Sequence, residues 1–180
     1  KPPQITEPLK VGLRKMINEM DGPEDFEKVY DAISGLDVSS LNKFERALEA
    51  VAMARERLSE MSGEESDLGE MEDRLDDLEM QLENKATEFA EELEEEKRAL
   101  IEESKTIAED VDLESFYPEE RMEVKKILEM REDELMGMTP KQVFLYRDIV
   151  HGLTEGFVNK EMYMCIQEMD VTLKRASWDV

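Results

Sequence analysis

The feature that most constrains the fold is a run of regularly spaced apolar residues from residue 64 to residue 111, with no proline inside it. The apolar residues recur at steps of mostly three, four or seven, which is the spacing of one apolar stripe along a helix. This predicted packing seam consists of Leu68, Met71, Leu75, Leu78, Leu82, Phe89, Leu93, Leu100 and Ile107. A single helix of about 70 Å cannot bury such a stripe alone, so other segments must lie along it.

The composition supports an all-α fold with a large surface. Charged residues make up 39% of the 180 residues, against about 25% in an average protein, and only 6% of the residues are aromatic. We therefore expect an elongated helical protein with a long central helix resembling a coiled coil, flanked by two units of short helices. The predicted parts are an N-terminal three-helix unit (1–62), the acidic central helix (63–111) and a C-terminal three-helix unit (112–180). One continuous elongated domain is the alternative.

Capping residues and prolines predict where the other helices begin. The expected starts are Thr6, Pro23, Ser39 or Ser40, Pro118, Thr139 and Asn159. Ser62 and Glu65 have capping-box spacing and predict the start of the central helix. Gly35 is expected to end the second helix, and Gly137 to end the helix that begins at Pro118.

The seam also predicts how the central helix is covered. Leu78, Leu82 and Ala86 are separated by four and four residues, one residue more than a strict heptad allows. We expect the central helix to divide there, with the helix from Ser40 folded back along its first half. The segment after Val111 would then cover its second half. An apolar seam does not show whose helix fills it, so a homodimer through the central helix is the other interpretation.

Two stretches, residues 23–43 and 140–160, align without gaps and suggest an internal repeat. Pro23, Gly35 and Asn42 of the first stretch recur as Pro140, Gly152 and Asn159 of the second. In this interpretation proline opens a helix, glycine ends it and asparagine caps the next one. Chance agreement is the alternative, because helix boundaries alone favour these residue types.

The second stretch resembles a known group of proteins. The motif Met138-Thr139-Pro140-Lys141-Gln142-Val143, followed by Asp148, Val150 and Asn159-Lys160, is similar to helical segments of very large bacteriophage proteins packaged inside the virion. The resemblance implies a structural spacer or packing module within, or cut from, a larger ejected or capsid-internal protein, located in the virion or the host cytoplasm. A chain that begins at Lys1 without methionine fits such a piece. The chain carries no polymerase or other catalytic motif of those proteins.

The charge distribution narrows the range of partners. The net charge is −24, and residues 64–114 contain 22 acidic and 5 basic side chains, a local net charge of −17. Such a surface repels phosphate backbones and anionic membranes, so we expect no direct nucleic-acid binding and no membrane binding. The sequence shows neither an apolar stretch of about 18 residues nor a signal peptide. A solvated helix face explains the acids, and a DNA mimic that binds a basic nucleic-acid-binding protein is the alternative.

Two candidate metal sites fail on their spacing. His151 is the only histidine, and Asp148 lies one helical turn before it, whereas a di-iron bundle needs two such histidine motifs. Asp110, Asp112 and Glu114 alternate like a calcium loop. However, Ser115 replaces the required glycine and Arg121 replaces the last glutamate. We therefore predict no metal site and no cofactor.

The sequence also gives little support to catalysis. Cys165 could in principle be activated by His151, but it lies beside the apolar stripe of Met162 and Ile166, which favours a packed thiol. The thirteen methionines fit a filled core, or a groove that grips a partner helix. We expect a non-enzymatic structural or interaction module without catalytic residues. Its partner would be another protein or other parts of a larger chain.

Overall fold

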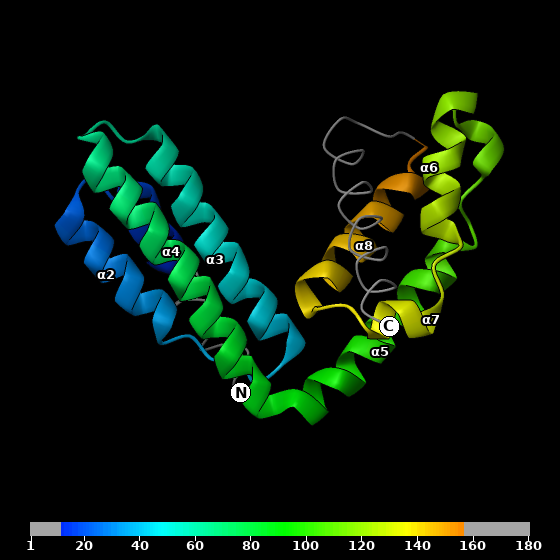
Figure 1. The fold of residues 1–180 in the computed structure, drawn as a ribbon, viewed down its shortest axis with the longest axis horizontal. Coiled ribbons are helices and arrows are strands. Elements are labelled where there is room, and N and C mark those ends of the chain that lie inside the picture. Colours follow the sequence, from blue (N-terminus) through cyan, green and yellow to red (C-terminus); the bar gives the residue numbers. More distant parts are fainter. Residues whose placement is uncertain (1–11, 157–180) are drawn as a thin grey trace. The chain divides into compact units, whose positions relative to one another are not determined.

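The computed structural model describes residues 12–156, and these residues form helices joined by short turns, with no strand among them (Figure 1). The prediction of an all-α fold is confirmed. Residues 12–19 are helical. The later elements are α2 (Pro23–Ser34), α3 (Leu41–Glu60), α4 (Glu65–Ala86), the 3-10 helix η1 (Thr87–Phe89), α5 (Ala90–Ala108), the 3-10 helix η2 (Leu113–Ser115), α6 (Pro118–Leu128), α7 (Glu132–Met136) and α8 (Pro140–Thr154).

The predicted long helix exists as a continuous helical run of 44 residues, made of α4, η1 and α5. We call residues 65–108 the central run. Its regular α-helix gives way to a single 3-10 turn directly after Ala86, where the heptad pattern has its extra residue. A stutter of this kind changes the local winding of the helix, and the tighter turn is one way to absorb the change. The predicted division of the central helix is therefore confirmed.

The chain forms two compact units, unit 1 (Lys1–Leu93) and unit 2 (Glu94–Val180). The boundary falls inside α5, so the two halves of the central run belong to different units. The sequence prediction instead treated residues 63–111 as a part of their own. The difference has a physical cause, because each half of the apolar seam is covered by the helices of its own unit.

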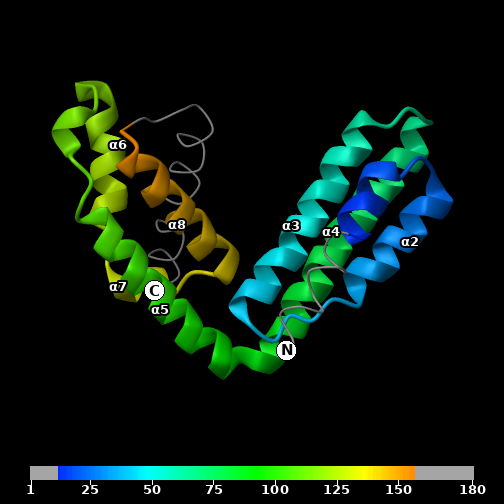
Figure 2. The same ribbon diagram turned by 180° about the vertical axis from the view of Figure 1, so that it is seen from behind.

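In unit 1, α3 folds back along α4 as predicted, and α2 packs against both of them (Figures 1 and 2). The Ser40 side chain caps α3 by accepting a hydrogen bond from the Lys43 backbone amide at 3.2 Å. The apolar faces of the three helices meet in one core. Its largest fully buried side chains include Phe26, Ile33, Phe44, Leu58, Leu75, Leu78 and Leu82.

In unit 2, the second half of the central run packs into a core with α6, α7 and α8. Ile101 is the fully buried residue of α5 in this cluster, and Phe116 enters it from the turn before α6. The other buried members come from the later helices. They are Val124, Ile127, Met130, Leu135, Met138, Val143, Tyr146, Ile149, Val150 and Leu153.

Two predicted helix boundaries are wrong. The N-cap of α4 is Glu64 without a side-chain cap, so Ser62 does not form the expected capping box. The helix from Pro118 does not reach Gly137, because α6 ends at Leu128 and α7 begins at Glu132. A second N-terminal cap explains this break. The Arg131 backbone amide donates to Glu134 Oε1 at 3.1 Å, and a new helix begins there.

The two stretches of the suggested repeat do not share their helix boundaries. Both begin with a proline in the first turn, but α2 ends at Ser34 whereas α8 passes through Gly152 to Thr154. Asn42 lies inside α3 rather than at its cap. The expected caps at Thr6 and Asn159 lie outside the described residues.

The cap of α8 gives a first testable prediction. Thr139 Oγ1 accepts from the Gln142 backbone amide at 3.3 Å, and the Thr139 amide donates to Gln142 Oε1 at 2.9 Å. Thr139→Ala should lower the free energy of unfolding of unit 2 by about 1 kcal/mol, measured by urea denaturation with circular dichroism. The matched Ser62→Ala should change nothing, because Ser62 caps no helix. Equal losses in both variants would contradict this assignment.

Candidate functional site

The predicted packing seam is covered within each unit, to different degrees along its length. In α4 the side chains of Met71, Leu75, Leu78 and Leu82 are buried against α2 and α3, while Leu68 is half-buried. In the rest of the central run Leu93 is buried, and Phe89, Leu100 and Ile107 are half-buried.

The buried face of α5 differs from the predicted one. Lys97, Ile101 and Ser104 are its most deeply buried residues in unit 2, and their steps of four and three place them on one helix face. Leu100 and Ile107 only flank this face. Sequence reasoning missed it because a lysine and a serine interrupt the apolar pattern, and lysine is almost never buried unless it is paired.

Lys97 is buried because its ammonium group has two main-chain partners. Its Nζ atom donates to the carbonyl oxygens of Met136 at 2.7 Å and Met138 at 2.8 Å. These carbonyls lie on either side of Gly137, directly at the end of α7. The last carbonyls of a helix lack partners within the helix and carry a partial negative charge. A cation is therefore the natural donor for them.

Lys85 forms the same arrangement in unit 1. Its Nζ atom donates to the carbonyl oxygens of Ser34 at 3.2 Å and Leu36 at 2.7 Å, on either side of Gly35 at the end of α2. Each unit thus attaches a short helix to the central run through one lysine and the two carbonyls that flank a glycine. No local sequence pattern predicts these contacts, because the partners are about 40 to 50 residues apart along the chain.

A third lysine supports the break between α6 and α7. Lys105 Nζ donates to the carbonyl oxygen of Met130 at 2.6 Å. Met130 lies between the two helices, where the helical hydrogen-bond pattern stops. The expected helix from Pro118 to Gly137 is therefore replaced by two helices whose junction is held from α5.

The two arginines of the central run also contact short helices. The Arg74 guanidinium forms an ion pair with Glu27 of α2 and lies 4.4 Å from the centre of the Tyr30 ring. The hydrogen bond from Arg74 lowers the pKa of Glu27 below its usual value. In unit 2, Arg98 lies 4.0 Å from the Glu132 carboxylate at the start of α7. All five basic residues of the central run thus contact other elements of their own unit.

This use of the cations leaves acidic side chains on the outer surface of α5. Glu91, Glu92, Glu94, Glu95 and Glu96 are all exposed. Lys97, the nearest cation along the helix, lies 3.8 Å from Glu94 but is directed into the core. The exposed surface of α5 therefore carries more carboxylates than cations.

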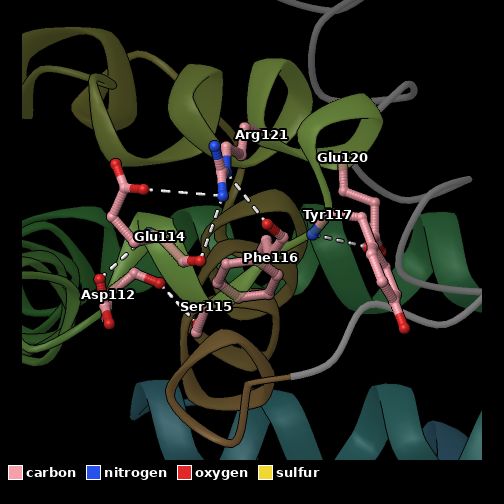
Figure 3. Close-up of polar contacts among 7 residues, drawn as sticks. All are labelled: Asp112, Glu114, Ser115, Phe116, Tyr117, Glu120 and Arg121. Carbon is pink, nitrogen blue, oxygen red and sulfur yellow. Dashed lines mark hydrogen bonds and ion pairs between the residues drawn. The ribbon is translucent and has the colours of Figure 1, made fainter.

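The acidic segment from Asp112 to Arg121 forms a turn rather than an ion site (Figure 3). Asp112 Oδ1 accepts from the Glu114 amide at 3.0 Å and caps η2. The Arg121 side chain donates to the carbonyl oxygens of Phe116 at 3.0 Å and Glu114 at 3.2 Å. The Asp112 carboxylate and the Arg121 guanidinium thus form hydrogen bonds with main-chain amide and carbonyl groups of the turn. The buried Phe116 ring anchors the turn in the core of unit 2.

The other candidate chemical groups do not converge. His151 is exposed near the end of α8, and Asp148 is paired with Arg147 at 2.8 Å. Cys165 lies outside the described residues. Within residues 12–156, no three His, Cys, Asp or Glu side chains come together as metal ligands. None of the helices in that range combines the length and apolar composition that a bilayer span needs.

Two buried hydroxyl groups of unit 2, Ser104 Oγ and Tyr146 Oη, have no hydrogen-bond partner among the described residues. Tyr146 is completely buried, and its burial raises the pKa of the phenol to about 12. An unpaired buried hydroxyl costs stability, and burial favours the protonated form of the phenol.

No protein-family model, curated protein or solved structure matches this chain.

The lysine contacts predict unit-specific effects. Lys85→Met should destabilise α2, and Lys97→Met should destabilise α7 and α8, each by about 1.5–3 kcal/mol, because main-chain carbonyls that are wholly or partly buried lose a charged donor. Hydrogen exchange followed by mass spectrometry would locate each effect. The matched Lys125→Met, which removes an exposed ion pair with Glu129, should cost at most about 0.5 kcal/mol. Exchange that rises equally in both units for both variants would contradict the account.

Tyr146 predicts a change of stability at alkaline pH. Its folded pKa of about 12 lies above the ordinary value of 10.0, so the unfolded chain loses the proton first and unit 2 loses stability between those values. Tyr146→Phe should remove this component and raise stability at pH 7 by about 1 kcal/mol, because no hydrogen bond is lost.

The measurement is the difference between wild type and variant in urea midpoints from pH 8 to pH 11. Tyr117→Phe is the matched control, since Tyr117 is 72% exposed. A variant less stable than wild type at pH 7 would show that the Tyr146 hydroxyl has a partner.

Proposed function

We propose that the chain is a non-enzymatic structural and interaction module, a self-contained helical part that acts through its surface within a larger protein or assembly. The observation that carries the proposal is the placement of charge on the central run. Its five cations contact other elements of their own unit, and nearly all of its acidic side chains are exposed. Such a run is suited to hold short helices and to present an acidic surface, and it offers phosphate groups no cationic face.

The covered seam supports a monomeric module. The seam side chains Leu75, Leu78 and Leu82 are already buried against α2 and α3. A second chain could reach them only if these helices moved away. We therefore favour a seam that is used within the chain over a homodimer through the central helix.

The virion setting is supported by the resemblance around Met138–Val143. In that setting the module would be a spacer or packing element of a protein enclosed with the phage genome. Its partner would be another protein or other parts of the same larger chain. An acidic surface would keep such an element from adhering to the packaged DNA.

Sedimentation velocity combined with circular dichroism tests the self-contained module. Over a hundredfold dilution we expect one monomeric species with unchanged helicity, because the seam is covered within the chain. Loss of helicity together with dissociation on dilution would show that the central run pairs between chains, and it would contradict the proposal.

The exposed glutamates of α5 favour one alternative function, that of a DNA mimic. A basic histone-like DNA-binding protein is a suitable probe, with fluorescence anisotropy at increasing salt as the measurement. We expect that the chain does not bind this protein in competition with DNA. Tight, salt-sensitive binding that DNA displaces would contradict our proposal and support the DNA mimic. In that case the double variant Glu92→Gln with Glu95→Gln should abolish the binding, and Glu119→Gln should not.

A further inference from the structure

Unit 1 contains a cavity of about 290 Å³ that the features above do not use. It lies between the helical residues 12–19, the turn after α2, and α3. Its apolar part is formed by Leu13, Ile17, Leu36, Ala50 and Met53. Its charged rim is formed by Arg14, Asp37, Lys43, Arg46 and Glu49.

One pair of charges on the rim is already satisfied. Lys43 Nζ lies 2.9 Å from Asp37 Oδ2, and Asp37 Oδ1 also accepts from the Ser39 amide at 2.9 Å. The Lys43 and Ser39 hydrogen bonds lower the pKa of Asp37 to about 2. Asp37 therefore stays ionised and neutralises Lys43 at any pH near neutrality.

The two arginines of the rim differ from the other arginines of unit 1. Arg14 and Arg46 have no hydrogen bond or ion pair among the described residues. The other three all have partners. Arg55 pairs with Asp76 at 2.5 Å, Arg57 donates to the carbonyl oxygen of Met20 at 3.0 Å, and Arg74 pairs with Glu27.

This contrast is informative because the chain has 47 acidic and only 23 basic side chains. Arg14 and Arg46 are exposed, yet neither has a carboxylate partner among the described residues, and both border the same apolar cavity. A guanidinium group binds carboxylates through two parallel hydrogen bonds and stays charged at all relevant pH values.

We propose that this cavity binds a small apolar carboxylic acid of the medium-chain fatty acid type, with its carboxylate at Arg14 and Arg46 and its alkyl chain against Leu13, Ile17 and Met53. The cavity volume of about 290 Å³ lies just below the range of about 300–1,000 Å³ for ligand sites, so the alkyl chain is short. With Lys43 neutralised by Asp37, the charges of Arg14, Arg46 and Glu49 sum to +1, which matches a singly charged carboxylate better than a doubly charged phosphate.

Titration of the full chain with decanoate, followed by ¹H–¹⁵N NMR, tests the proposal. We expect saturable shifts at amides of residues 12–19, of the turn after α2 and of α3. Decanol has the same alkyl chain without the charge, and it should bind roughly tenfold more weakly or worse. Decyl phosphate should also bind more weakly than decanoate.

Variants distinguish the site from general hydrophobic binding. Arg14→Gln and Arg46→Gln should each weaken decanoate binding by roughly tenfold, since one charged contact is lost. The matched Arg55→Gln lies on the same helix α3 but away from the cavity, and it should leave the affinity unchanged. Met53→Trp, which fills the cavity, should abolish binding of decanoate and decanol alike.

Three results would overturn the proposal. The first is decanoate binding that Arg14→Gln and Arg46→Gln do not change, and the second is a set of shifts outside the cavity. The third is binding that appears only after residues 1–11 are deleted, which would assign the cavity to that segment of the chain. Circular dichroism of each variant confirms that a loss of binding is not a loss of fold.

Discussion

The hydrogen bonds from lysine ammonium groups to main-chain carbonyls at helix ends are the interaction on which both units depend. A short helix that ends inside a protein leaves carbonyl oxygens without partners, and burying them unpaired is costly. Lys85 and Lys97 meet this need for α2 and α7, and Lys105 meets it at the break before α7. Because all three donors lie on the central run, the same bonds that satisfy the helix ends also attach these helices to it.

The charge of the surface follows from the same contacts. Residues 64–114 contain 22 acidic and only five basic side chains. Each of the five basic side chains contacts another element of its own unit. The outer side of α5 is left acidic, and an acidic surface repels phosphate groups. In unit 1, Arg14 and Arg46 border an apolar cavity and have no hydrogen bond or ion pair among the described residues. The chemistry of this cavity points to an anionic ligand, whereas the acidic helix points to no ligand by itself.

Local signals in the sequence predicted much of the fold, and long-range contacts account for the rest. Pro23, Ser40, Pro118 and Thr139 mark helix starts because capping depends on neighbouring residues alone. The stutter before Ala86 likewise located the 3-10 turn. The break at Arg131 and the passage of α8 through Gly152 were missed, since a competing cap and a packed helix override single-residue preferences.

The buried face of α5 was missed because Lys97 is a polar residue that is buried only through partners about 40 residues away along the chain. Lys85 donates to the two carbonyls that flank Gly35, and Lys97 donates to the two that flank Gly137. The two units therefore share an arrangement that the alignment of residues 23–43 with 140–160 did not show.

The most direct test is an NMR measurement of the lysine ammonium groups in the intact chain. A hydrogen bond between Nζ and a carbonyl slows proton exchange and transmits a coupling to the carbonyl carbon. The account predicts slowly exchanging ammonium signals for Lys85, Lys97 and Lys105, with couplings to the carbonyls of Leu36, Met138 and Met130. If these three lysines instead exchange as fast as the exposed Lys125 and show no such coupling, the attachment of the short helices to the central run must rest on something else.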